Sequence, residues 1–228
     1  MTVYRELGVR TLINAKGPAT RLSGGIMRPE VATAMTEASQ ACVDIADLQA
    51  AASRIIAEAT GAEAGYVASG ASACLLIGAA ACITGLDPGR MARLPDTSGM
   101  KNECVMVRSQ RNFYDHAIRA TGLAIVEVGL PDRYAGAGVR DAEAWEIEDA
   151  ITERTAAVFY VADQQARPPL TEVARAAHAR GVPVIVDAAA QLPPQGNLRR
   201  FIAEGADLVA FSGGKATRSA PSAMNRRR

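Results

Sequence analysis

Every residue from Val182 to Val186 is apolar, and an acidic residue, Asp187, follows directly. A strand without a polar face is buried on both sides, as in parallel sheets that helices cover. Shorter apolar runs alternate with amphipathic segments along the rest of the chain. The predicted strands are residues 65–68, 104–107, 124–128, 156–161, 182–186 and 208–211. The sequence therefore predicts an α/β fold whose mainly parallel sheet carries helices on both faces.

Between these strands, helices are marked by residues that begin or end them. Helices are expected over 47–60 and 170–180, because a glycine follows each of them. Asn197 is predicted to cap another short helix. Residues 87–101 are rich in proline and glycine, which predicts an ordered loop.

Charge and cysteine content exclude several functional classes. The chain has 25 basic and 24 acidic residues, and its net charge of +1 gives no indication of a surface that binds tRNA. The four cysteines form no CxxC pair, which argues against a metal site. Residues 1–10 are polar, and the apolar run 74–86 is too short to span a bilayer. We therefore expect a cytoplasmic protein that binds no membrane.

A turn of small residues, Ser69-Gly70-Ala71-Ser72, links the first predicted strand to an Ala-rich helix. Small side chains let backbone N–H groups close around a phosphate, and the helix dipole favours its charge. A plain tight turn explains the same residues equally well. Alone, this turn leaves both interpretations open.

Asp187 ends the fully apolar strand, at the edge where α/β sheets bind ligands. A carboxylate that emerges from a buried strand needs a partner to offset desolvation. A protonated pyridine nitrogen is one such partner, and small residues around Ala189 would let a flat ring pack against the chain. A structural ion pair or a helix cap is the alternative role.

Lys215 follows the last predicted strand through Ser212 and two glycines. A desolvated lysine loses its proton and attacks an aldehyde, although a lysine after glycines is also an ordinary loop residue. The run is no P-loop, because Val209 stands where a glycine is required and Ala216 replaces the hydroxyl residue. A phosphate turn, then an aspartate, then a lysine, each at a strand end, is the order of a pyridoxal-phosphate (PLP) site.

Longer stretches around these residues resemble the SelA-like family of fold-type-I PLP enzymes, which contains selenium transferases and ammonia-lyases. The stretches are Arg10-TLINAKGPATRLSGGIM, Ser69-GASA, Met91-ARLPDTSGMKNE, Arg111-NFYDHAIRATG, Val184-IVDAAAQLPP and Asp207-LVAFSGGKA. The resemblance implies a fold-type-I large domain, PLP as the cofactor and an assembly of at least two identical subunits.

The resemblance also implies roles for single residues. Lys215 would form the Schiff base, and Asp187 would pair with the ring nitrogen. The turn 69–72 and Ser212 would lie near the phosphate.

Four further residues are candidates at this site. His116 is a candidate to stack on the ring, or else a histidine at a helix start that bonds to the backbone. Gln191 is a candidate to bond the ring hydroxyl or the substrate. Arg21 and Lys101 are candidates to hold a substrate carboxylate or phosphate, within one subunit or across a dimer interface.

The function that the resemblance implies is β-elimination or β-replacement on a small amino acid, which is phosphorylated in some relatives. The alternative within enzymes is selenium transfer to L-seryl-tRNA(Sec). The alternative outside enzymes is an inactive, truncated fragment that at most binds PLP.

The expected division of the chain is an N-terminal arm (1–30), a PLP-binding large domain (31–217) and an aberrant tail (218–228). The family continues after Gly-Gly-Lys-Ala with Arg-Gly-Pro-Gln and a small C-terminal domain, whereas this chain reads Ala220-Pro221-Ser222. A one-base shift of codons for Gly-Pro-Gln gives Ala-Pro-Ser. We therefore hypothesise a frameshift or a sequencing error, which the DNA after codon 217 would test.

Overall fold

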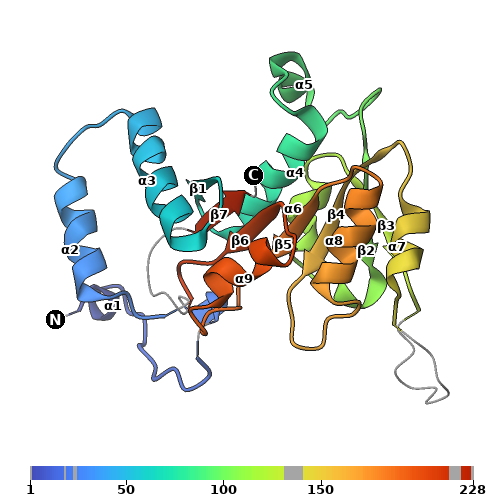
Figure 1. Cartoon of the computed structure of the whole chain (residues 1–228). Coiled ribbons are helices and arrows are strands. Elements are labelled where there is room, and N and C mark those ends of the chain that lie inside the picture. The colour runs from blue at the N-terminus through green and yellow to red at the C-terminus, as the bar shows by residue number, and fades with distance from the viewer. Residues whose placement is uncertain (1, 18, 23–24, 131–140, 216–221, 227–228) are drawn as a thin grey trace.

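A seven-stranded sheet organises the computed structural model of the chain, which describes residues 2–17, 19–22, 25–130, 141–215 and 222–226 (Figure 1). The strands are β1 (Ala64–Ala68), β2 (Glu103–Val107), β3 (Ala124–Val128), β4 (Thr155–Val161), β5 (Val184–Asp187), β6 (Leu208–Phe211) and β7 (Ser222–Arg226). Their order across the sheet is β1-β7-β6-β5-β4-β2-β3.

The sheet is parallel from β6 through β5, β4 and β2 to β3, while β7 runs antiparallel to both β1 and β6. The predicted mainly parallel sheet is therefore confirmed, and β7 is an element that was not predicted. Of the tail at 218–228, residues 222–226 form β7, and the others lie outside the described residues. The division of the chain at 30 and 217, and the frameshift hypothesis, stay predictions.

Helices lie on both faces of the sheet, as predicted (Figure 1). They are α1 (Val3–Glu6), α2 (Pro29–Ala38), α3 (Ile45–Thr60), α4 (Ala71–Thr84), α5 (Pro88–Arg93), α6 (Asp115–Arg119), α7 (Ala144–Ala150), α8 (Leu170–Ala179) and α9 (Asn197–Ala203). Two 3₁₀ turns, η1 (Thr20–Leu22) and η2 (Arg108–Gln110), complete the described elements.

Alternate residues of the central strands enter two separate cores, because successive side chains of a strand point to opposite faces. Val158, Val184 and Val209 pack with α7, α8 and α9 in one core. Phe159 and Ile185 pack with α4 and α6 in the other. The central strands are thus buried on both faces, as the apolar run at 182–186 predicted.

Three local predictions need correction. The expected loop at 87–101 begins with α5, because Asp87 accepts a hydrogen bond from the Arg90 N–H at 3.1 Å and caps the helix. Gly196, not Asn197, occupies the cap position of α9, and the Asn197 amide donates to the Gln191 carbonyl oxygen at 2.7 Å instead. Strand β5 begins at Val184, two residues later than predicted.

Helices α1 and α2 of the N-terminal segment lie away from the sheet. Figure 1 shows α1 and α2 at the end of the molecule beyond α3, and neither helix contains a buried residue. Among the described helices, none is both long and apolar enough to cross a membrane.

Candidate functional site

Asp187 lies at the carboxyl tip of β5, in the centre of the sheet. Its neighbour in register on β6 is Ala210, and Lys215 follows five residues after that neighbour. Because Val186 belongs to the core of α8 and α9, the next residue, Asp187, points to the face that α4 covers. The fold therefore brings the predicted aspartate and lysine to adjacent strand tips.

The Asp187 carboxyl is buried, with 6% of the residue exposed. Burial raises its pKa above the usual 3.8, while a hydrogen bond from the Ala189 N–H at 3.0 Å and the charge of Lys215 lower it. The net shift is upward, so the chain alone does not fully compensate the carboxylate. A cationic N–H donor placed against it would supply the missing interaction.

Lys215 is half-buried just beyond β6, and its backbone N–H donates to the Ser212 carbonyl oxygen at 3.4 Å. Its charge acts on Asp187 strongly enough to affect the pKa of that carboxyl. The ε-amine thus faces the same edge of the sheet as the buried acid. This proximity is the arrangement that a ring held between the two groups requires.

The small-residue turn at 69–72 forms the start of α4. Gly70 caps the helix with a φ of 101°, a backbone conformation that favours glycine, and an added Cβ there would meet open space. Among the described residues, no hydrogen-bond acceptor faces the N–H groups of Ala71 and Ser72. These two donors, at the positive end of a 14-residue helix, suit a phosphate group.

The loop after β5 is held in place by its own hydrogen bonds. Gln191 donates through its amide to the Ala162 carbonyl oxygen at 2.7 Å, and its backbone N–H donates to the Ala188 carbonyl oxygen. Ala189, half-buried, lies between these contacts and Asp187. Gln191 therefore anchors this loop to the end of β4, a structural task that the sequence did not predict.

His116 lies exposed in the first turn of α6, which packs against α4. The residue before it, Asp115, is buried and accepts hydrogen bonds from Arg111 at 2.5 Å and Arg119 at 3.1 Å. Arg111 also pairs with Glu127 of β3. This ionic cluster fixes the position of α6 and was missed, although the i, i+4 spacing of its charges is visible in the sequence.

Gln110 is a second positioning residue that sequence reasoning missed. It is buried, its side-chain oxygen accepts the Val161 N–H at 2.9 Å, and its amide donates to the Arg167 carbonyl oxygen at 3.4 Å. It thereby links the exit of β2 to the end of β4. A single glutamine after a strand carries no signal that would have identified it.

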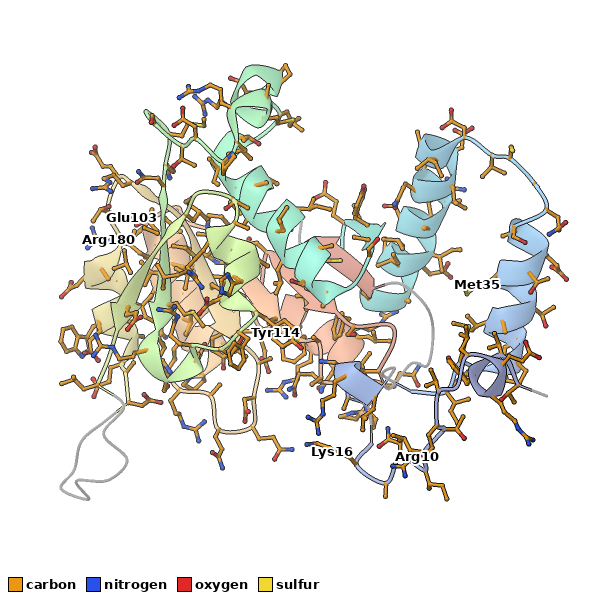
Figure 2. All side chains as sticks on the ribbon, turned by 180° about the vertical axis from the view of Figure 1, so that it is seen from behind. Arg10, Lys16, Met35, Glu103, Tyr114 and Arg180 are labelled. Atoms are coloured by element: carbon orange, nitrogen blue, oxygen red, sulfur yellow. The ribbon has the colours of Figure 1, made fainter. Side chains whose placement is uncertain are left out.

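The two basic candidates for substrate binding lie at different places. Arg21 is exposed in η1, within the N-terminal arm. Figure 2 shows Lys16 of this arm on the side of the sheet where Tyr114 lies, which is the carboxyl edge. Lys101 precedes β2, and Glu103 lies at the opposite, amino edge in the same view. Within this chain, Lys101 is therefore separated from Asp187 and Lys215.

The edge as a whole can hold a flat molecule with a cationic ring nitrogen at one end and an anionic group at the other. Asp187 suits the nitrogen, and the start of α4 suits the anion. Lys215 follows β6, and β6 lies between β5, which carries Asp187, and β1, which leads to α4, because the order of these strands is β1-β7-β6-β5. The donor set therefore fits the cofactor that the sequence implies.

Comparison with known proteins agrees with this geometry. No family model matches the chain. It is 39% identical over 222 residues to D-glucosaminate-6-phosphate ammonia lyase of Salmonella typhimurium (strain 14028s / SGSC 2262), with 94% of this chain and 57% of that protein covered. It is 37% identical over 222 residues to 5'-C-glycyluridine monooxygenase-decarboxylase of a Streptomyces species, with 93% and 53% covered.

A solved structure of D-glucosaminate-6-phosphate ammonia-lyase superposes on this fold with a TM-score of 0.90 and 37% identity. The alignment covers 100% of this chain and 61% of that one. The chain thus spans between half and two thirds of the length of these relatives.

Proposed function

Since this chain belongs to the fold-type-I family of PLP-dependent enzymes, we propose that its carboxyl edge binds PLP and serves an ammonia-lyase type of β-elimination. The observation that carries the proposal is the buried acid at the tip of β5: burial raises its pKa, and the charge of the neighbouring Lys215 acts against that rise. The name of the ammonia lyase relative favours elimination over selenium transfer.

Each cofactor contact is assigned to a group on this edge. Asp187 would hold a proton on the ring nitrogen, and Ala189 would lie against the ring. The N–H groups at the start of α4, together with the Ser69, Ser72 and Ser212 hydroxyls, would hold the phosphate. His116 would stack on the exposed ring face, and Gln191 would bond the ring hydroxyl.

When bound, PLP withdraws electrons from the substrate carbon that loses a proton. Lys215 would hold the cofactor covalently in the resting protein, and its freed amine would take the proton from that carbon once an amino substrate is bound. Asp187 would stabilise the positive ring, because its carboxylate is buried and has only one N–H donor among the described residues. Loss of the leaving group from the next carbon, followed by hydrolysis of the eliminated product with water, would give a keto acid and ammonia.

The proposed substrate is a small amino acid that carries a phosphate group. The name of the ammonia lyase relative supports this choice, and Arg21 in the arm is the proposed contact for a substrate phosphate or carboxylate. Release of ammonia from D-glucosaminate-6-phosphate, compared with unphosphorylated D-glucosaminate, tests the substrate. Equal rates on both compounds would contradict a phosphate contact.

We further propose a cytoplasmic protein that assembles from at least two copies of the chain. Apolar residues of the N-terminal segment support self-association, because Val3, Tyr4 and Leu7 are 51–70% exposed. Size-exclusion chromatography with light scattering would measure the assembly.

The cofactor assignment has a sharp test, because the sequence contains three lysines: Lys16, Lys101 and Lys215. Purified protein mixed with PLP should absorb near ~420 nm, and borohydride should fix the label on one lysine. We expect the band in Lys16→Ala and Lys101→Ala, which are matched controls at exposed positions, and its loss in Lys215→Ala. Peptide mapping that finds the label on Lys16 or Lys101 would overturn the assignment.

A further inference from the structure

The positive charge of this protein is concentrated at one end of the sequence. Residues 1–28, here called the basic arm, contain five basic residues and one acidic residue, for a formal charge of +4. The remaining residues, 29–228, contain 20 basic and 23 acidic residues, for a formal charge of −3. The net charge of +1 therefore hides a strong asymmetry between the basic arm and the rest of the chain.

The cations of the basic arm are not neutralised by acidic neighbours. All five are exposed, and within the described part of the chain none of them forms an ion pair; they are Arg5, Arg10, Lys16, Arg21 and Arg28. The turn that carries Lys16 is held by its own hydrogen bonds, because Asn14 accepts the Lys16 N–H at 3.0 Å and donates to the Gly17 carbonyl oxygen at 2.8 Å. The arm thus presents uncompensated positive charge to the solvent.

This charge lies on the same side of the sheet as the proposed cofactor site. Figure 2 shows Arg10 and Lys16 on the side of Tyr114, which is the carboxyl edge, whereas Glu103 and Arg180 lie at the amino edge. At the amino edge the arginines are compensated, because Arg180 pairs with Glu148 at 3.3 Å and Arg154 with Glu103 at 3.1 Å. The two edges therefore differ in their electric field.

The tips of the central strands do not cancel this field. Between the end of β4 and the start of α8, the charged residues are Asp163 and Arg167, which balance each other. Asp187 and Lys215, after β5 and β6, form a second balanced pair, and the loop 188–196 contains no charged residue. The positive potential at this edge must therefore come from the basic arm.

We propose that the basic arm attracts PLP to the carboxyl edge through its electric field, with Arg10 and Lys16 as the charges that act on the phosphate. The inference rests on the proposed function, since the phosphate belongs to the cofactor. No contact between arm and cofactor is needed, because the Debye length is about 30 Å at about 10 mM salt. A field of this kind raises the rate constant of association, whereas a direct contact would chiefly lower that of dissociation.

Stopped-flow absorbance near ~420 nm measures the association of the purified chain with PLP, and pyridoxal, which lacks the phosphate, is the uncharged comparison. The double variant Arg10→Gln/Lys16→Gln should bind PLP about threefold more slowly at about 10 mM salt, and the difference should disappear at about 500 mM salt. The rate with pyridoxal and the dissociation rate of PLP should not change. At saturating PLP, the double variant should reach the same absorbance as the natural chain.

The matched control is Lys101→Gln/Arg175→Gln, which removes two exposed charges from the amino edge and from α8. It should keep the natural association rate, and thermal unfolding would show that both double variants keep the fold. An equal slowing of PLP and pyridoxal, an equal slowing in the control, or faster dissociation as the only change would overturn the inference while the band itself supports cofactor binding. Absence of the band in the natural chain would overturn the proposed function and this inference together.

Discussion

Replacing Asp187 by Asn in the cofactor-free chain is expected to raise the free energy of unfolding at neutral pH. The residue is 6% exposed, and burial raises the pKa of its carboxyl more than the Ala189 N–H and the Lys215 charge lower it. Asparagine keeps the shape and the oxygen that accepts the Ala189 N–H. It removes the negative charge that the fold without cofactor disfavours.

The size of the gain follows from the link between pKa and stability. Each pKa unit of net rise corresponds to about 1.4 kcal/mol, and stabilising changes at functional positions typically give about 0.5–2 kcal/mol. We therefore expect about 1 kcal/mol, which raises Tm by about 2–4 °C in a chain of this length.

The pH dependence of this gain has a definite sign. The pKa of Asp187 is higher in the folded chain than its ordinary value of 3.8. The natural chain is therefore at its most stable, with respect to this group, below that ordinary value, and it loses stability as pH rises through the folded pKa. The advantage of Asp187→Asn should be absent in acid and grow toward neutral pH.

Thermal and urea unfolding over this pH range measures the difference, with Asp207→Asn as the control. The Asp207 carboxylate accepts the Val184 N–H at 2.8 Å and pairs with His178 at 2.8 Å, so its loss should cost about 1–3 kcal/mol. A less stable Asp187→Asn at neutral pH, or a gain that does not change with pH, would refute the reasoning. With PLP added, the same variant should retain the cofactor less well.

Two further predictions concern the packing around the site. Gly65→Ala would bring a Cβ into overlap with Cβ and Cγ2 of Ile56 on α3, which should lower the free energy of unfolding by about 1–3 kcal/mol. The double variant with Ile56→Ala should lose less stability than the sum of the two single variants. Urea unfolding of the natural chain, both single variants and the double variant would show this. Asp115→Asn should cost about 2–3 kcal/mol at neutral pH, because two arginines donate to the buried carboxylate. Burial raises the pKa of Asp115, but Arg111 and Arg119 hold it below its usual value, so the loss measured by thermal unfolding should vanish as pH falls through that lowered pKa.

The parallel strands could be predicted because a few consecutive residues specify each of them. A run such as 182–186 has no polar face, so it specifies burial on both sides, and the residue that follows it must lie at a strand tip. Asp187 and the neighbouring Lys215 were placed in this way. Strand β7 was missed because Asn225 and Arg226 interrupt its apolar character, and because one of its two partners, β1, lies more than 150 residues away in the sequence.

Residues outside strand tips were harder to place. Lys101 precedes a predicted strand, so its position at the amino edge was implicit in the sequence, but its charge and loop setting suggested a substrate contact. Gln110 and Gln191 act through hydrogen bonds between loops, which no spacing rule reveals. A cavity lined by Tyr160 of β4, Leu170 of α8 and Phe201 of α9 depends on how these elements pack, which is visible only in three dimensions.

The insertion of β7 between β1 and β6 has a consequence for how this molecule forms. Strand β1 is made early in synthesis, yet its hydrogen-bonded neighbour in the sheet is built from residues 222–226, more than 150 positions later. Closing so long a loop is slow, so we expect the pairing of β1 with β7 to form late in folding. Pulse-labelled hydrogen exchange should accordingly protect β4 and β5 before β1.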